Sequence, residues 1–182
     1  MADFSWRREP KWAQVEHDVA VNDVRLALTQ ACVKQPQFTL AEWIPQSEFW
    51  GHPDAVVYTD HAGKQQKRHV RPDGYGVIVL EEKRFRFLVE LDRATEDNPR
   101  FVREKVYPGI AYLRSEVYKR RFGFNAGRFL IITTGERRAR NMKRQAEQAV
   151  GKEARLFYFT TFAQVAPETI LTATIWSRGG QE

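Results

Sequence analysis

The chain has 182 residues, of which 42% are hydrophobic and 29% charged, and this suits one domain with a single sizeable core. Its net charge of +6 and isoelectric point of about 9.6 fit a nucleic acid or another acidic partner but specify no fold. One cysteine, Cys32, excludes an intrachain disulfide framework and a thiolate metal cage. The N-terminus lacks the apolar run of a signal peptide, and no stretch reaches the roughly 18 apolar residues that span a bilayer, so we expect a cytoplasmic protein without a membrane partner.

The N-terminal segment divides into an arm and a helix. Residues 1–14 mix tryptophan, proline and basic side chains, so we expect an N-terminal arm followed by a single α/β domain at residues 15–182. A helix is predicted from about Glu16 to Lys34, because the following residues recur at helical spacing: His17, Val21, Val24, Leu28 and Ala31. The place of His17 on this apolar stripe favours a buried, hydrogen-bonded side chain over a ligand or a base.

Two strand patterns dominate the middle of the chain. The clearest strand is residues 84–92, where apolar and polar side chains alternate. A second strand is predicted at residues 70–80, interrupted early by Pro72-Asp73-Gly74 and joined to the first by a turn at residues 81–83. The other middle segments are a strand at 38–44, an ambiguous stretch at 48–58, and a polar turn or mobile loop at 59–67.

The second half of the chain alternates helices and strands. A long helical stretch is expected from about residue 98 to 121, with a kink at Pro108-Gly109. Residues 128–134 are continuously apolar, which is typical of a central strand covered on both faces. The remaining segments are a helix at 136–150, a strand at 156–161, and an edge strand or a short helix at 167–176. Early strands without intervening helices favour an antiparallel meander, and later strands separated by helices favour parallel pairing, so we predict a central mixed sheet flanked by helices, of the α/β (α+β) class.

Three carboxylates are expected to lie together on the central strands. Glu90 and Asp92 are two residues apart, so their side chains share a face of the strand, about 7 Å apart at the backbone, opposite the apolar face. If the two strands form a hairpin with its turn at residues 81–83, the numbers of two paired residues sum to about 164. Asp73 then lies opposite Leu91 and is a cross-strand neighbour of both Glu90 and Asp92. Like charges this close destabilise a sheet unless a divalent cation or basic side chains neutralise them. Mg²⁺ and Mn²⁺ prefer such oxygen ligands, so Asp73 and Glu90 are candidate metal ligands.

Each of these carboxylates also has a structural interpretation. Pro-Asp-Gly is a common turn sequence in which Asp73 would stabilise the turn. Asp92 is placed to cap the segment that follows, and Glu90 has Arg93 and Arg71 as candidate ion-pair partners. A metal site and a purely structural cluster therefore both stay open.

Basic side chains follow the acidic strand in two groups. The candidates for phosphate contacts are Arg93, Arg100 and Arg103, and then Arg137, Arg138, Arg140, Lys143 and Arg144 on the predicted helix 136–150. Contacts of this kind would make binding sensitive to salt and largely independent of base sequence. A solvated helix face explains the second group equally well.

Four segments together carry a resemblance to known proteins: His17 to Leu28, Arg71 to Gly74, Phe87 to Glu96, and Lys105 with Tyr107 and Tyr112. The order of these motifs resembles the PD-(D/E)XK restriction-endonuclease-like superfamily. More closely, the chain resembles the replication-relaxation family of plasmid and mobile-element proteins, from about residue 15 to 162. The resemblance implies a restriction-endonuclease-like core and a DNA-directed role in replication.

Two departures from the family pattern bear on activity. The superfamily's active sequence is Glu-x-Lys, and Asp92 stands here in place of the lysine, which leaves Asp92 an assisting role. The resemblance implies Lys105, at the start of the next helix, as a migrated lysine that would orient or activate the attacking water. Family members usually carry a winged-helix module ahead of the nuclease-like domain, and the arm at residues 1–14 is too short for one, so we expect specificity to come from this domain or from a partner.

Three functions stay open at this point. The first is a Mg²⁺- or Mn²⁺-dependent DNA endonuclease or nicking subunit, with Asp73, Glu90, Asp92 and Lys105 as its catalytic set. The second is a catalytically inactive, nuclease-fold DNA-binding or scaffold subunit of a larger complex, acting with a protein partner or as a homodimer. The third is an RNA-binding or RNA-processing module, which the lack of exposed aromatic runs disfavours.

Overall fold

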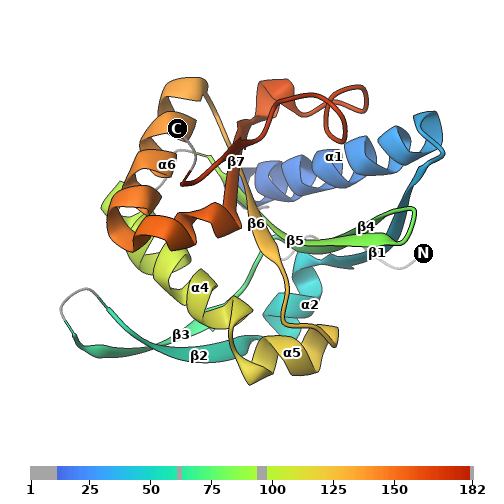
Figure 1. The fold of residues 1–182 in the computed structure, drawn as a ribbon. Helices are drawn as coiled ribbons and strands as arrows, with labels where there is room; N and C mark the ends of the chain where they lie inside the picture. The colour runs from blue at the N-terminus through green and yellow to red at the C-terminus, as the bar shows by residue number, and fades with distance from the viewer. Residues whose placement is uncertain (1–11, 61–62, 94–97, 181–182) are drawn as a thin grey trace, which may run out of the picture.

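A mixed sheet forms the centre of the computed structural model, which describes residues 12–60, 63–93 and 98–180 (Figure 1). Within these residues the sheet has six strands in the order β1-β4-β5-β6-β7-β8. Their bounds are β1 Phe38–Pro45, β4 Gly74–Leu80, β5 Lys83–Asp92, β6 Arg128–Thr133, β7 Phe157–Thr161 and β8 Ser177–Arg178. The pairs β1/β4, β4/β5 and β7/β8 are antiparallel, whereas β5/β6 and β6/β7 are parallel. This arrangement confirms the predicted fold class.

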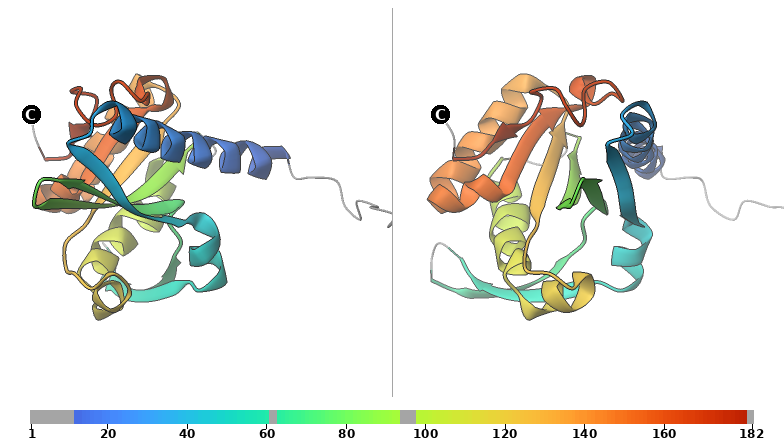
Figure 2. Two further views of the ribbon diagram at one scale, coloured as in Figure 1. Left: turned by 90° about the vertical axis from the view of Figure 1, so that its right-hand side faces the viewer. Right: turned by 45° about the vertical axis from the view of Figure 1, so that its right-hand side comes forward.

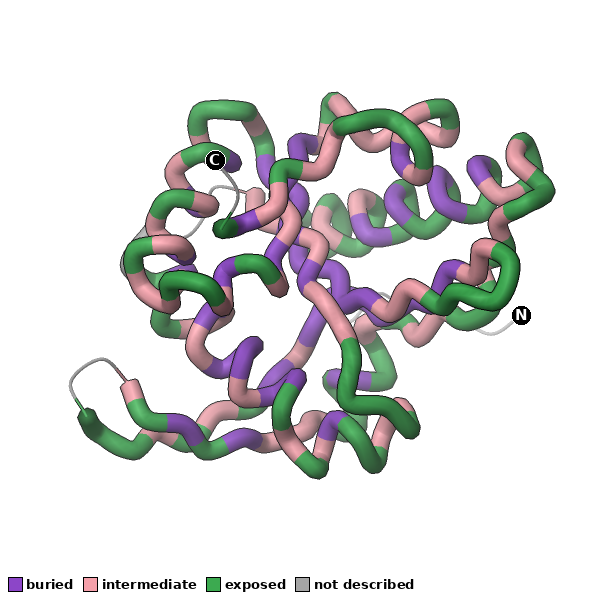
Figure 3. The backbone as a smooth tube through the Cα atoms, in the orientation of Figure 1, coloured by how far each residue is buried: buried purple, intermediate pink, exposed green. Residues whose placement is uncertain are grey.

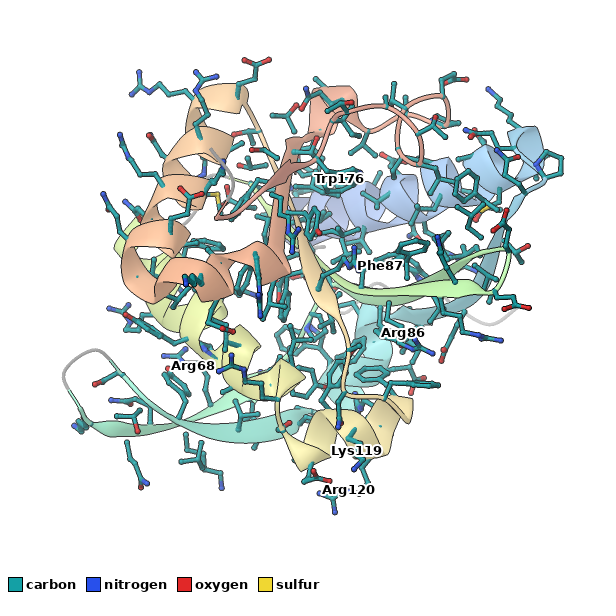
Figure 4. The ribbon with its side chains drawn as sticks, viewed as in Figure 1. Arg68, Arg86, Phe87, Lys119, Arg120 and Trp176 are labelled. Atoms are coloured by element: carbon teal, nitrogen blue, oxygen red, sulfur yellow. The ribbon has the colours of Figure 1, made fainter. Side chains whose placement is uncertain are left out.

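Helices cover both faces of the sheet (Figure 2). Helix α1 (Trp12–Lys34) packs Val24, Leu28 and Ala31 against one face, where Phe87 and Trp176 also lie (Figure 4). The opposite face is covered by α4 (Tyr107–Leu113) and α6 (Glu136–Val150). The face of β5 that carries Glu90 is therefore also core, and Figure 3 shows the buried residues concentrated along the central strands. The structure thus places the acids beneath a second helical layer.

The segment between β1 and β4 forms a separate unit below the main sheet. It consists of α2 (Gln46–Gly51) and a two-stranded antiparallel sheet of β2 (Asp54–Thr59) and β3 (Gln65–Val70). The ambiguous stretch at 48–58 is thereby resolved. The prediction of a loop over residues 59–67 was wrong at its C-terminal end, because β3 begins at Gln65. The side chains at the start of β3 are polar, so the sequence shows no alternation of apolar and polar residues there. Residues 61 and 62 lie outside the described part.

The helical stretch after β5 is divided differently from the prediction. It contains α3 (Asn98–Phe101), a π-helical turn (Val102–Val106), α4 and α5 (Glu116–Phe122). The kink predicted at Pro108-Gly109 falls just after the change from the π-helical turn to α4, whose first turn contains Pro108. The helical stretch is interrupted before Ser115, whose hydroxyl caps α5 by accepting a hydrogen bond from the Tyr118 amide at 3.1 Å.

The two ends of the described chain also differ from expectation. Helix α1 begins at Trp12, so the last residues of the predicted arm are helical, and residues 1–11 lie outside the described part. Residues 167–176 contain turns, and the edge strand is β8, which follows them. Short 3₁₀ helices at Gly151–Leu156 and Phe162–Gln164 flank β7. No helix in the described residues is long and apolar enough to cross a bilayer.

Candidate functional site

A cleft of about 740 Å³ opens between the first half of α1, the α2 to β3 unit and the π-helical turn. Asp73 and Glu90 lie in it, and each is only 5% exposed. Both come from the central sheet, Asp73 from the residue ahead of β4 and Glu90 from near the end of β5. The remaining charged side chains that line the cleft are Glu16, His17, Arg68, His69, Arg71, Asp92, Arg93, Arg100, Glu104 and Lys105.

Asp73 is held by hydrogen bonds from three elements. Its Oδ1 accepts from His17 Nε2 at 3.0 Å and from Gln46 Nε2 at 3.2 Å, and its Oδ2 accepts from the Leu91 amide at 2.7 Å. Its own amide donates to the Val89 carbonyl at 2.9 Å. Asp73 therefore ties the start of β4 to β5, α1 and α2, which is more than the turn-stabilising role of a Pro-Asp-Gly sequence.

His17 is the basic neighbour of Asp73. The hydrogen bond to Asp73 raises the pKa of His17; burial opposes this rise, while the charges of Asp73, Asp18 and Glu90 add to it. The predicted hydrogen bond of His17 is confirmed, but its side chain is 19% exposed and therefore only partly buried. Its partner on the sheet could not be assigned from the sequence.

Glu90 pairs with Lys105. The Lys105 Nζ lies 2.5 Å from Glu90 Oε2, and the Glu90 side chain is 7% exposed. Lys105 comes from the π-helical turn, an irregularity that is frequent at functional sites. The structure thus brings Lys105 to Glu90, whereas Arg93 and Arg71, the ion-pair partners that the sequence suggests for Glu90, are not in this pair. The catalytic role that the resemblance implies for Lys105 stays a prediction.

Asp92 turns toward α6. Its carboxylate accepts a bidentate hydrogen bond from the Arg138 guanidinium, with Nη2 at 2.7 Å from Oδ1, and a further bond from Thr133 Oγ1 at 2.5 Å. Both oxygens are engaged by β6 and α6, so Asp92 ties these elements to the end of β5, and the predicted cap of the segment after β5 stays a prediction. That segment, residues 94–97, lies outside the described part.

The register of the β4–β5 hairpin differs by one residue from the prediction. Leu80 pairs with Lys83, so paired numbers sum to 163 and the register extends to bring Asp73 opposite Glu90. The reason is a two-residue turn at Glu81-Glu82, with Glu81 at a positive φ of 54°, in place of the expected three-residue turn.

Each acid of the cluster thus has a basic partner from another element: Asp73 with His17, Glu90 with Lys105, and Asp92 with Arg138. In the described part of the chain, no three His, Cys, Asp or Glu side chains are grouped so that they could hold a metal ion. Asp73 and Glu90 both present carboxylate oxygens to the cleft, and such oxygens are the ligand type that Mg²⁺ prefers.

The predicted phosphate contacts fall into two groups, one beside the cleft and one on α6. Arg93 and Arg100 line the cleft; Arg93 bonds Glu16 at 2.5 Å, and Arg100 bonds Glu104 at 3.0 Å. Arg103 lies 3.7 Å from the same Glu104.

On α6, Arg138 points inward to Asp92, and Arg137 is exposed. Arg140 pairs with Glu136 at 3.3 Å and Lys143 with Glu147 at 3.6 Å, both one turn away. Arg144 bonds Asn141 at 3.0 Å. These local pairs favour the solvated-face interpretation of this group.

Sequence reasoning missed the wall contributed by α2 and β3. Gln46, Trp50 and Arg68 line the cleft from this unit, whose secondary structure was ambiguous. The four-residue spacing of Gln46 and Trp50 is the one signal that places both on the same helical face.

Comparison with known proteins identifies one family. A family model described as Replication-relaxation matches residues 4–127, which is more than half of the chain. The match includes Asp73, Glu90, Asp92 and Lys105, but it begins earlier and ends earlier than the predicted resemblance over residues 15–162. No match was found among curated proteins or among solved structures. The chain belongs to the replication-relaxation family.

Proposed function

We propose that this protein acts on DNA in the replication of a plasmid or mobile element, and that the cleft is a metal-dependent centre that cleaves a phosphodiester. The family membership supports the role in replication. The observation that carries the proposed chemistry is the convergence of Asp73, Glu90 and Lys105, from three separate elements, in one cleft. This is the acid, acid, lysine set of the PD-(D/E)XK resemblance, with the lysine supplied by the helical segment after the strand.

The donor set fits Mg²⁺ or Mn²⁺. Asp73 and Glu90 offer carboxylate oxygens, and Asp73 is already oriented by Gln46, His17 and the Leu91 amide. When bound, such an ion would polarise the phosphodiester and lower the pKa of an attacking water. Glu90 would share its charge between the ion and Lys105, and Lys105 would hold that water or stabilise the charge that develops on the phosphate. Asp92 would assist indirectly, by keeping Arg138 and α6 against the end of β5.

The rim of the cleft suits a DNA backbone. Arg68, Arg71, Arg93 and Arg100 line it, and their charges would attract phosphates. Glu16 pairs with Arg93, and Glu104 pairs with Arg68 and Arg100, so DNA phosphates would replace these glutamates as partners of the arginines. Binding of this kind should weaken steeply as the salt concentration rises.

The test is calorimetric titration of Mg²⁺ and Mn²⁺ with a plasmid-nicking assay on the same samples. We expect the Asp73→Asn and Glu90→Gln variants, which keep the side-chain shapes, to lose metal binding and to lose nicking by about 100-fold or more. Lys105→Met should retain metal binding and lose nicking. Asp23→Asn, which removes an exposed acid from α1, is the matched control and should behave as the wild type. Cutting by a folded Asp73→Ala variant at the wild-type rate would refute the proposed centre.

A second function is favoured by a specific observation. Asp73, Glu90 and Asp92 each pair with a basic side chain from another element, so all three acids have partners without a metal. Together with Asp92 in the lysine position of the motif, this supports a catalytically inactive DNA-binding or scaffold subunit of a larger complex. Plasmid retention at low salt with no heat of metal binding is its expected result, and chelator-sensitive cutting by the purified protein would count against it.

A further inference from the structure

An exposed tryptophan stands at the rim of the cleft. Trp50 is 56% exposed although it belongs to α2, a helix that packs Phe49 fully inside the molecule. Gln46, one helical turn earlier, lines the same cleft and donates a hydrogen bond to Asp73. The indole is therefore held close to the acid pair by a short, well-anchored helix, and it leaves a large apolar surface in contact with solvent.

Arg71 backs this indole. Its guanidinium carbon lies 4.7 Å from the centroid of the Trp50 ring, which is within the range of a cation–π contact. The Nε of Arg71 is buried and has no hydrogen-bond partner within the described residues. Because this Nε is closed to solvent, a ligand phosphate would contact the guanidinium at its terminal nitrogens. Pro72 separates Arg71 from Asp73 and fixes the backbone between the two side chains.

We propose that Trp50 and Arg71 form a subsite that stacks one unpaired nucleobase beside Asp73 and holds its phosphate. The bases of a duplex are stacked on each other and cannot offer a face to a protein ring, so this subsite selects single-stranded or locally melted DNA. Arg68 and Arg93, also on the cleft wall, supply further positive charge for the strand. The inference rests on the proposed function, because it requires the cleft to bind DNA, but it does not require cleavage.

The chain contains a matched control for this pair. Phe124 is 49% exposed, and the Arg86 guanidinium carbon lies 3.4 Å from its ring centroid, so it has a similar exposure and the same kind of cation–π partner. Phe124 does not line the cleft. If general surface hydrophobicity caused the binding, substitution of either aromatic residue would lower the affinity for single-stranded DNA. If a base-stacking subsite causes it, only substitution of Trp50 would.

The experiment measures binding of a fluorescent oligonucleotide of about 15 nucleotides, single-stranded or as a duplex, in chelator so that no strand is cut. We expect the wild type to prefer the single strand, Trp50→Ala to lose about 10-fold or more of that affinity, and Trp50→Phe to keep most of it. Duplex binding by Trp50→Ala should stay at the wild-type level, and Phe124→Ala should match the wild type with both probes.

Two outcomes would overturn the inference in distinguishable ways. If the wild type binds both probes with equal affinity and Trp50→Ala has no effect, the subsite is contradicted, but the proposed DNA function is not. If the wild type binds neither probe at low salt, both the subsite and the proposed function are contradicted. A thermal melt of each variant, compared with the wild type, establishes that a loss of affinity does not come from unfolding.

Discussion

Asp92 and Arg138 show how this chain keeps a carboxylate largely buried. Their side chains are 12% and 21% exposed, and two guanidinium nitrogens face the two carboxylate oxygens. Removing one member of such a pair leaves the other charge without compensation in a poorly solvated site, and this costs more than the pair itself contributes. Arg138 is thus a structural residue, although the sequence presents it in the middle of a basic helix face.

We expect Arg138→Ala to lower the free energy of unfolding by roughly 3 kcal/mol, the lower end of the range for a broken buried pair. Arg140→Ala is the control, because Arg140 is 71% exposed and pairs only along the helix with Glu136; it should change stability by less than about 0.5 kcal/mol. Urea denaturation measures both. Equal losses in the two variants would show that the Asp92 pair is not the source of the effect.

The ion pairs of Glu104 make the stability of the protein depend on pH. Burial raises the pKa of Glu104, but the hydrogen bond and charge of Arg100, with the charges of Arg68 and Arg103, outweigh this and lower the pKa below its usual value. A lowered folded-state pKa stabilises the protein above the unfolded-state pKa, and this contribution is lost as the pH falls through the folded-state value.

We therefore expect Glu104→Gln to be less stable than the wild type by up to about 1 kcal/mol near neutral pH, as for other partly exposed ion pairs. The difference should shrink as the pH falls below about 4.3, the ordinary pKa of a glutamate, and vanish at more acidic pH. Urea denaturation of both proteins across this range checks the prediction. A difference that persists after full protonation would have to come from packing.

At the scale of elements, the β4–β5 hairpin depends on a glycine opposite an aromatic side chain. Gly76 pairs with Phe87 across the hairpin, and a Cβ at Gly76 would lie 2.5 Å from Phe87 Cζ. Phe87 is 4% exposed and packs in the core beneath α1, so it has little room to move. The absence of a side chain at Gly76 is what allows Phe87 to lie flat across the strand.

Gly76→Ala should destabilise the protein by about 1–3 kcal/mol, the usual cost of overpacking a core. Gly51→Ala, at the end of α2, is the control, because a Cβ there meets no atom within 4 Å; it should be neutral within about 0.5 kcal/mol. Thermal and urea unfolding of both variants test this. A neutral Gly76→Ala would mean that Phe87 can rotate away without loss of packing.

The elements that were predictable from sequence are those whose burial leaves a regular pattern. Strand β5 alternates, β6 is continuously apolar, and α6 has a clear inward stripe of Ala139, Met142 and Ala146. The α2 to β3 unit left no such pattern, because its elements are six residues each and half exposed. The hairpin register was missed by one residue because a two-residue turn and a three-residue turn have no distinguishing sequence at Glu81-Glu82.

The candidate site was predictable only in part, for a similar reason. Asp73, Glu90 and Lys105 follow from motif order, and the structure brings them to one cleft. The partners of the acids depend on which helix crosses which strand end, so His17 and Arg138 could not be assigned from spacing. The contribution of Trp50 depended on the unpredicted helix α2.

At the scale of the whole molecule, α1 is held to the sheet in two different ways. Its second half buries Val24, Leu28 and Ala31 against the sheet, whereas its first half exposes Val15 and Val19. The first half is fixed instead by polar contacts with the site: His17 bonds Asp73, and Arg93, just after β5, bonds Glu16 and the Ala13 carbonyl at 3.3 Å. One wall of the cleft thus depends on the charges in it.

We therefore expect the double variant His17→Ala/Arg93→Ala to exchange the amide hydrogens of residues 12–20 about 10-fold faster than the wild type, since charged hydrogen bonds of about 1.5 kcal/mol or more are lost. Residues 24–34 and strands β5 and β6 should keep their protection, because their apolar contacts are intact. Hydrogen–deuterium exchange mass spectrometry resolves these segments, and Asp23→Ala/Arg25→Ala, which changes two exposed side chains of α1, is the control. Faster exchange along the whole of α1 would show that the helix opens as one unit. The position of the cleft wall would then be set by the apolar core and not by the polar contacts of the acidic site.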